Sequence, residues 1–272
     1  MKILVILSLS CLSFAQTYEV SIIGVSSRES SSEVYTRYKP FTDYLSRKVY
    51  SGMVKGSVKL RVFKNEKELR TALQEGTIHI ARLSPQSFIM VQSKLTNIHL
   101  FAGELKDHQF FEEGSLIVQK SNFVRNFTHF KNHSFAFGPK TSPLLDIVPK
   151  SVLSEKGLTN SDLKPLYLSD VEKVMRYVEV GRVIAGVIPS KSLPEDDRFR
   201  VFAEFSAPGM VWAMSDRIFL STRDKIKSEF LEVDEPPIMR SMLITGFRKI
   251  SNHDLLEYKQ ALNKAMIYYK KK

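Results

Sequence analysis

Three short stretches of the sequence place hydroxyl side chains next to turn-forming residues. They are Ser26-Ser27, Ser84-Pro85 and Lys140-Thr141-Ser142. Each follows a strand-like run, and the last two precede a helical pattern. Hydroxyl groups and the free N–H groups of a helix N-terminus donate hydrogen bonds to small anions. The three stretches therefore predict anion binding, and none carries the paired groups that acid–base or nucleophilic catalysis requires.

The most informative of these stretches lies within Phe135–Pro149, which reads FAFGPKTSPLLDIVP. An apolar run breaks at Gly138-Pro139, and a helical pattern starts at Pro143. Ser142 is a favoured N-cap residue, and proline suits the first helical turn. An anion could therefore sit in front of this helix, beside Lys140. Taken alone, the stretch is also explained by an ordinary capped helix after a strand, so its context has to decide.

The first hundred residues predict an alternation of strands and helices. Apolar residues recur at three- and four-residue steps in the first helix. The expected strands are 18–25, 57–63, 78–83 and 97–102, and the expected helices are 33–50, 66–74 and 86–92. This order predicts an α/β fold with helical crossovers, in which ligands bind beyond the carboxyl ends of the strands.

The rest of the chain continues the alternation of strands and helices and then becomes mostly helical. Further strands are expected at 114–118, 135–138, 165–168, 183–188, 200–205 and 210–214, with helices at 143–156 and 170–180. From Asp216 to the end the pattern is mostly helical, with breaks at Pro236-Pro237 and near Ser251-Asn252.

The composition fits a soluble globular protein with a basic balance. The 272 residues are 43% hydrophobic and 25% charged, and the formal net charge is +11. Such a charge can serve nucleic acid, an acidic membrane surface or a small anionic ligand. Lysine and arginine are spread along the chain, and the only dense run is Lys270–Lys272. Nucleic-acid binding is therefore not favoured.

The N-terminus predicts export by a signal peptide, residues 1–15. Lys2 precedes the short apolar run Ile3–Phe14, and Ser13-Phe14-Ala15 fits a small-x-small cleavage site, so the mature chain begins at Gln16. The run is too short to span a membrane. Cys11 is the only cysteine and could instead carry a lipid anchor, although the residues before it form a poor lipobox. A chain that begins at Gln16 has no disulfide and no thiolate site.

Five stretches, in order, carry a resemblance to a known family. They are Tyr38–Leu45, Glu75–Pro85, Gly114–Val118, Phe135–Pro149 and Gly246–Ile250. In this order and spacing the chain resembles the phosphonate/phosphite/phosphate family of periplasmic substrate-binding proteins that serve ABC importers. The resemblance covers nearly the whole mature chain.

The resemblance implies a type 2 periplasmic-binding-protein fold. This is an α/β fold of two lobes, each with a mixed sheet, joined by two crossover strands that act as a hinge. Lobe 1 would comprise residues 16–104 and 206–272, and lobe 2 would comprise residues 105–205. The crossovers are expected near Ala102–Leu105 and Ala203–Ser206.

The resemblance also implies a ligand site in the cleft between the lobes. Carried over by position, the ligand-binding residues are Ser26, Ser27, Ser84, Thr141 and Ser142. Lys140 or Arg82 could add charge, and Tyr35 could line the cleft, whereas the helical phase places Tyr38 and Tyr44 in the core. Asp170 falls where some family members use an acid to meet an ammonium group, but it is also a plausible N-cap of the next helix.

Pro143 and Asp146 are among the residues that depart from the family pattern at the predicted site. Pro143 removes one N–H donor from the turn. Asp146 lies in the first helical turn, where its charge favours the helix but opposes a bound anion. The fold implied by the resemblance is less affected by these changes than its phosphonate ligand is.

The expected function is capture of a small oxyanion and its delivery to an ABC permease. A sensory protein of the same fold, which reports to a membrane histidine kinase or receptor, is the alternative that the sequence does not separate. We expect a monomer without catalytic activity and without a cofactor. His129 and His133 have a metal-like spacing, but no carboxylate accompanies them on the same turn, so no metal site is predicted.

Overall fold

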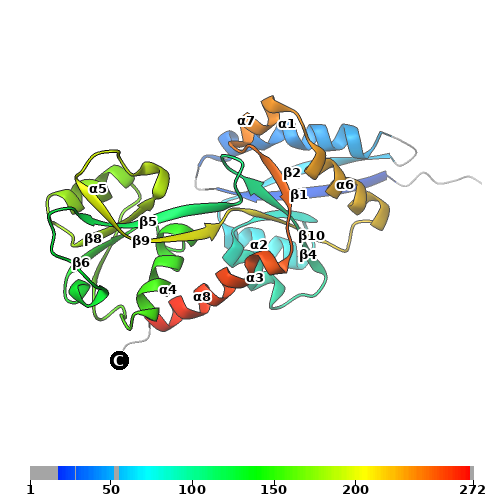
Figure 1. Ribbon diagram of the computed structural model, residues 1–272. Helices are drawn as coiled ribbons and strands as arrows, with labels where there is room; N and C mark the ends of the chain where they lie inside the picture. The colour runs from blue at the N-terminus through cyan, green and yellow to red at the C-terminus, as the bar shows by residue number, and fades with distance from the viewer. Residues whose placement is uncertain (1–17, 28, 52–54, 270–272) are drawn as a thin grey trace, which may run out of the picture.

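The computed structural model describes residues 18–27, 29–51 and 55–269, and its strands form two mixed sheets (Figure 1). The predicted signal peptide, Cys11 and Lys270–Lys272 lie outside the described residues. The first sheet has the order β11-β4-β10-β3-β1-β2 and the second the order β7-β6-β8-β5-β9. The α/β fold class with a mixed sheet in each half is therefore confirmed.

The six-stranded sheet is built from both ends of the chain. Its strands are β1 (Tyr18–Ser26), β2 (Lys55–Phe63), β3 (Ile80–Leu83), β4 (Ile98–Leu105), β10 (Val211–Ser215) and β11 (Gly246–Lys249). Its helices are α1 (Ser31–Val49), α2 (Glu66–Glu75), α3 (Pro85–Gln92), α6 (Leu220–Glu232) and α7 (Pro236–Met242). The predicted β-α-β-α-β-α-β order of the first hundred residues is confirmed.

The five-stranded sheet is built from the middle of the chain. Its strands are β5 (Phe111–Gln119), β6 (Ser134–Phe137), β7 (Lys164–Tyr167), β8 (Ala185–Pro189) and β9 (Phe199–Pro208). It carries α4 (Val148–Glu155), α5 (Val171–Glu179) and the short turns η1 (Phe127–Phe130), η2 (Pro143–Ile147) and η3 (Ser190–Ser192). The predicted helix after Ser142 thus begins as the wider π-type turn η2 and narrows into α4.

The C-terminal part is mostly helical, as expected, but it also contains one strand that the sequence pattern does not show. Gly246–Lys249 is not helical but forms β11, which pairs antiparallel with Ala102–Leu105 at the edge of the first sheet. Four residues are too few to show an alternating pattern, so the strand depends on the edge that β4 offers. The remainder is helical, with the turn η4 (Asn252–Leu255) and the helix α8 (Leu256–Tyr268) at the end.

Two adjacent connections join the sheets, a few residues after the crossovers expected near Ala102–Leu105 and Ala203–Ser206, which lie within β4 and β9. Lys106–Phe110 connects β4 to β5, and Gly209-Met210 connects β9 to β10. The amide of Gly209 donates to the carbonyl of Phe110 at 2.8 Å, so the two connections lie side by side. Asp107 and His108 turn the first connection with φ of 50° and 62°.

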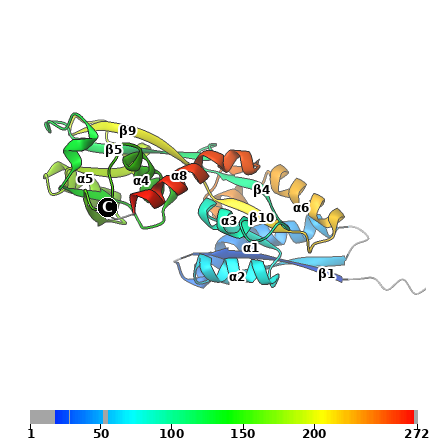
Figure 2. The same ribbon diagram turned by 90° about the horizontal axis from the view of Figure 1, so that it is seen from below.

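The helix α8 makes a third link between the two sheets. It starts beside α3, where Leu255 is buried with the first sheet's residues, and it ends with Tyr268 buried among residues of the second sheet. Figure 2 shows α8 running from α3 to α4. We keep the division into lobe 1 (16–104 plus 206–272) and lobe 2 (105–205) as a proposal, with boundaries shifted by a few residues because β4 stays in the first sheet to Leu105 and β9 in the second sheet to Pro208. The C-terminal helix of lobe 1 packs against α4 of lobe 2.

The core of lobe 1 is aromatic and fixes the sheet that carries the first half of the site. Trp212 is fully buried, with the rings of Phe41 and Phe230 at 6.2 and 5.1 Å from its own. Tyr38 and Tyr44 are each 4% exposed, which confirms their placement in the core. Aromatic pairs of this edge-to-face kind add to the stabilisation from buried apolar area.

Candidate functional site

The hydroxyl stretches of lobe 1 leave the same edge of the first sheet. Gly24 of β1 pairs in parallel with Ala81 of β3, so Ser26-Ser27 and Ser84 follow the carboxyl ends of neighbouring strands. This is the edge at which α/β sheets bind ligands. Ser26, Ser27 and Ser84 are all half-buried.

The hydroxyl stretch of lobe 2 has the same relation to its own sheet. Ala136 of β6 pairs in parallel with Gly186 of β8, and Phe137 pairs with Tyr167 of β7. Lys140-Thr141-Ser142, Ser190-Lys191 and Asp170 therefore leave one edge of the second sheet. Each sheet thus has one edge where the C-terminal ends of its parallel strands meet, and hydroxyl side chains lie along it. We call this the carboxyl edge of the sheet.

In lobe 1 the hydrogen-bond donors at the start of α3 already bind a carboxylate side chain of the protein. Ser84 is the N-cap of α3, and its hydroxyl accepts the amide N–H of Ser87 at 3.2 Å. The carboxylate of Glu66 accepts the amide N–H of Ser84 at 3.0 Å and its hydroxyl at 2.7 Å. Glu66 also accepts the hydroxyl of Ser87. A negative group in front of a helix N-terminus is stabilised by the helix dipole.

The lobe 2 turn is held in the same manner by Asp146. Its carboxylate accepts the amide N–H of Thr141 at 2.9 Å, while the hydroxyl of Ser142 accepts the amide N–H of Leu145 at 3.1 Å. Thr141 has a φ of 70°, which is unusual for a β-branched residue and typical of strained ligand-binding turns. The hydroxyl of Thr141 has no intramolecular partner within the described part of the chain, and its side chain is exposed.

A fully buried ion pair supports the lobe 2 turn. Asp146 is 1% exposed and pairs with Lys150, which is 0% exposed. Lys150 also donates to the hydroxyls of Tyr167, at 2.9 Å, and Tyr269. Burial alone lowers the pKa of Lys150, but the hydrogen bonds to Asp146, Tyr167 and Tyr269 outweigh burial and raise it. The end of α8 is therefore tied to the candidate ligand turn through one carboxylate.

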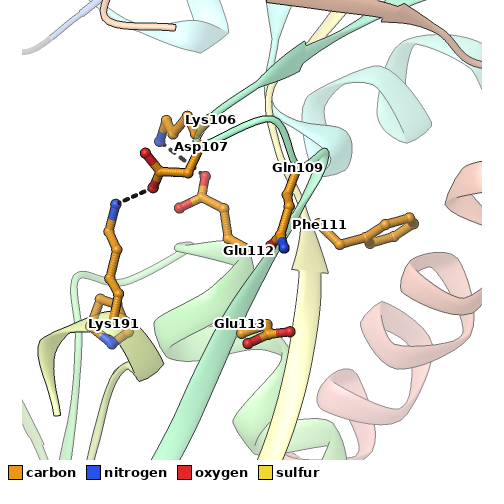
Figure 3. Close-up of a pocket in the computed structure, with 8 residues that line it drawn as sticks. Lys106, Asp107, Gln109, Phe111, Glu112, Glu113 and Lys191 are labelled. Carbon is orange, nitrogen blue, oxygen red and sulfur yellow. Dashed lines mark hydrogen bonds and ion pairs between the residues drawn. The ribbon is translucent and has the colours of Figure 1, made fainter. Parts of the chain in front are cut away.

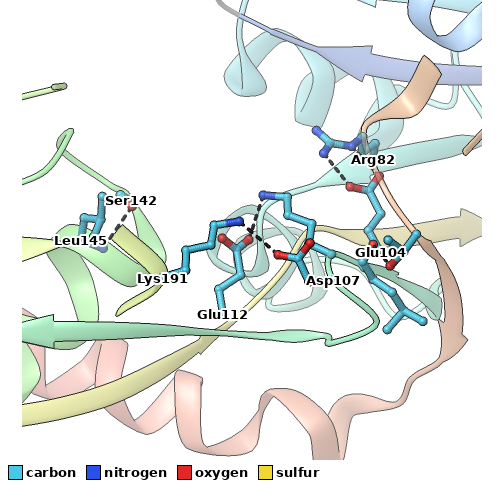
Figure 4. Close-up of polar contacts among 10 residues, drawn as sticks. Arg82, Glu104, Asp107, Glu112, Ser142, Leu145 and Lys191 are labelled. Atoms are coloured by element: carbon cyan, nitrogen blue, oxygen red, sulfur yellow. Dashed lines mark hydrogen bonds and ion pairs between the residues drawn. The ribbon is translucent and has the colours of Figure 1, made fainter. Parts of the chain in front are cut away.

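A second buried ion pair lies within the first sheet. Arg82 of β3 donates from Nε and Nη2 to the two oxygens of Glu104 of β4, both at 2.6 Å (Figure 4). Trp212 Nε1 donates to the same carboxylate at 3.0 Å, and Arg82 lies over the ring of Tyr38 at 5.7 Å. Because Glu104 satisfies two of its nitrogens, Arg82 is first of all a structural cation.

A small cavity lies at the connection between β4 and β5, and none of the predicted ligand residues lines it. The cavity has a volume of about 230 Å³ and is lined by residues of the β4–β5 connection, β5 and η3 (Figure 3). Lys106 pairs with Glu112 at 2.9 Å, and Lys191 of lobe 2 pairs with Asp107 of the connection at 3.2 Å. Phe111 points away from Lys191. These ion pairs are exposed and are therefore weak.

The remaining predicted residues have identifiable local partners. Tyr35 is 44% exposed on α1, and Lys140 lies 4.8 Å from the ring of Tyr167. Asp170 is the N-cap of α5, where its Oδ1 accepts the amide of Glu172 at 2.9 Å. A role for Asp170 in ligand binding stays a prediction, since capping already accounts for its position. The Nδ1 of His129 accepts the amide of Arg125 at 3.2 Å.

Several residues of this region were not recognised in the sequence. Glu66, Glu104, Lys150 and Lys191 carry no motif, and Glu66 reaches Ser84 across 18 residues of chain. The pair Asp146–Lys150 has the i,i+4 spacing that favours an ion pair on a helix, so this signal was available. Within the described residues, no cluster of three or more His, Cys, Asp or Glu side chains could hold a metal ion.

The two mixed sheets and the two connections between them fit the two-lobed periplasmic-binding-protein fold. Residues 23–255 match the family described as "ABC transporter, phosphonate, periplasmic substrate-binding protein". The chain belongs to this family and is a periplasmic substrate-binding component of an ABC transporter. The resemblance noted in the sequence is thereby confirmed. No helix of the described residues is long and apolar enough to cross a membrane.

Solved structures share this fold at low sequence identity. XAC2383 from Xanthomonas citri bound to ATP has a TM-score of 0.74 at 13% identity, covering 92% of this chain and 99% of that one. PhnD1 from Prochlorococcus marinus in complex with methylphosphonate has a TM-score of 0.64 at 17% identity, covering 90% and 98%. A binding protein of an ABC phosphonate transporter from Pseudomonas aeruginosa has a TM-score of 0.62 at 16% identity, covering 91% and 86%.

Proposed function

We propose that this chain captures a small phosphorus oxyanion between the carboxyl edges of its two lobes and delivers it to the permease of an ABC importer. The observation that carries the proposal is the matched pair of edges, each with hydroxyl groups beside a capped helix N-terminus. Ser26 and Ser27 approach the ligand from lobe 1, and Thr141 and Ser142 approach it from lobe 2. Family membership and the methylphosphonate complex of PhnD1 support the ligand class.

The finer features of the proposal follow from the sequence. The chain is exported by the signal peptide of residues 1–15, is not anchored through Cys11, and works as a monomer. It binds without converting its ligand, since the two edges offer hydrogen-bond donors but no nucleophile–base pair. Delivery to a permease is favoured over a sensory role because the matched family is that of transporter components.

Thermal denaturation in the presence of methylphosphonate, phosphite or phosphate tests the proposal. A ligand at about 100 times its Kd stabilises the folded protein by about 2.7 kcal/mol. For a chain of this size that corresponds to a rise in Tm of about 5 °C. Sodium chloride at equal ionic strength is the control for non-specific salt effects.

A pair of variants makes the thermal experiment specific for the site. Ser27→Ala removes a hydroxyl from the lobe 1 edge and is expected to reduce the ligand-induced shift. Ser93→Ala removes a hydroxyl at the opposite end of α3 from Ser84 and is expected to leave the shift unchanged. If none of the three phosphorus oxyanions raises Tm at millimolar concentration, the proposed ligand class is wrong.

A further inference from the structure

Two carboxylates of the protein already occupy donors that a bound oxyanion would use. In lobe 1, Glu66 takes the amide and hydroxyl of Ser84 and the hydroxyl of Ser87. In lobe 2, Asp146 takes the amide of Thr141. Each lobe therefore holds its own negative charge at the edge where the ligand is expected.

The two charges differ in how they are compensated. Asp146 is neutralised by Lys150. Glu66 has no ion pair among the described residues. Arg70 donates to the hydroxyl of Ser87 at 2.8 Å, and Arg82, which lies within electrostatic range of Glu66, is hydrogen-bonded to Glu104. The hydrogen bonds of Glu66 are with neutral groups, so its negative charge remains a source of repulsion for a second anion.

A buried hydroxyl lies within the field of both carboxylates. Tyr258 of α8 is 3% exposed and packs against Leu144 and Ile147 of η2. Its hydroxyl has no hydrogen-bond partner among the residues that the structure describes. Burial raises the pKa of Tyr258, and the charges of Glu66 and Asp146 raise it further. Both carboxylates therefore disfavour a negative charge at the hydroxyl of Tyr258.

The donors that remain free suit a ligand of low charge. The hydroxyls of Ser26, Ser27 and Thr141 have no acceptor in the described part of the chain. Lys140, beside Thr141, is exposed and can match one negative charge. A second charge on the ligand would face Glu66 without a matching free cation on α3.

We propose that Glu66 makes the cleft selective for tetrahedral oxyanions with a single negative charge, such as a sulfonate or a singly protonated phosphonate. The inference rests on the proposed function, because it assigns the charge of the ligand that the same cleft binds. Glu66 acts as a resident anion in front of α3, and Asp146 holds the opposite turn. The neutral hydroxyls thereby bind the head group of a monoanion, whereas the charge of Glu66 weakens the binding of a dianion.

Calorimetric titration of the full chain with methanesulfonate and methylphosphonate tests this charge selection. The two probes have similar shapes, and well above the second pKa of an alkylphosphonate, which is higher than that of a phosphate monoester, methylphosphonate is a dianion whereas a sulfonate keeps one charge. We expect wild-type protein to bind methanesulfonate at least about tenfold more tightly, since partly buried charges at this range are incompletely screened. Glu66→Gln keeps the shape of the side chain and removes its charge.

The variant separates charge selection from a preference for sulfur. Glu66→Gln is expected to strengthen methylphosphonate binding and to reduce the ratio to about threefold or less. Glu68→Gln, an exposed residue on the same helix, is the matched control and is expected to leave the ratio unchanged. Binding of the dianion as tightly as methanesulfonate, or an unchanged ratio in Glu66→Gln, would overturn the inference while the proposed function stands. If neither probe binds any of the proteins, both fall.

A titration at a second pH shows whether the site accepts any tetrahedral monoanion or only sulfonates. At about pH 6 a larger share of methylphosphonate carries one charge. Binding that becomes as tight as that of methanesulfonate indicates that any tetrahedral monoanion is accepted. Binding that stays about tenfold weaker indicates that the site takes sulfonates.

Discussion

Replacing Arg82 by methionine is expected to lower the free energy of unfolding by about 3–5 kcal/mol. The substitution keeps much of the side-chain volume but leaves Glu104, which is 2% exposed, with only Trp212 Nε1 as a donor. A buried carboxylate without its cation pays a desolvation penalty that one neutral hydrogen bond does not offset. Urea unfolding followed by fluorescence measures the loss, and Trp212, the only tryptophan, reports directly on this cluster.

Two variants control for the loss of an arginine as such. Arg198→Met removes a cation from an exposed pair with Asp196 and is expected to leave the unfolding midpoint unchanged. The double variant Arg82→Met/Glu104→Leu removes both buried charges and is expected to recover most of the stability. If Arg82→Met alone unfolds at the wild-type midpoint, the ion pair is not the structural element that we describe.

Replacing Lys150 by methionine is expected to lower the free energy of unfolding by a similar amount, about 3–5 kcal/mol. It leaves Asp146 buried and uncompensated, and it removes the hydrogen bonds that tie Tyr167 and Tyr269 to this point. Because Asp146 also holds Thr141, the ligand turn is expected to loosen together with the end of α8. Chemical unfolding followed by circular dichroism gives the loss, and amide hydrogen exchange at Thr141 and Tyr268 tests the coupling.

The paired variant Lys150→Met/Asp146→Asn distinguishes an electrostatic loss from a packing loss. The asparagine oxygen can still accept the amide of Thr141, but no charge remains buried. We expect the double variant to be more stable than Lys150→Met, with a coupling of about 1–3 kcal/mol. A double variant that is less stable than Lys150→Met would mean that Lys150 acts by filling space.

Sequence periodicity located the strand ends well because it depends on local residues. Ser84 follows a short apolar strand and precedes a proline-started helix, and Ser142 does the same in lobe 2, so both helix starts could be predicted. The helix starts need no knowledge of distant contacts. The pairing of β1 with β3, which brings the ends of these two strands together, was not predicted, since the βαβ order alone does not say which strands are neighbours in the sheet.

The role of Glu66 at the site could not be predicted because it depends on tertiary packing. Glu66 caps a helix other than its own, and nothing near Ser84 in the sequence indicates this. Tyr268 is fully buried against lobe 2 although its helix belongs to the C-terminal segment of lobe 1. The strand β11 was missed for the same reason, since four residues became a strand only through pairing with β4.

The most direct test of the central claim is a crystal structure of the full chain grown with methylphosphonate or methanesulfonate. We predict that the tetrahedral head group lies between the two carboxyl edges, with oxygens within about 3.2 Å of the hydroxyls of Ser26 or Ser27 and of Thr141. Glu66 should remain bound to Ser84 in that complex. A head group bound elsewhere, for example in the cavity beside Lys191, or an oxyanion in the place of Glu66, would contradict the account.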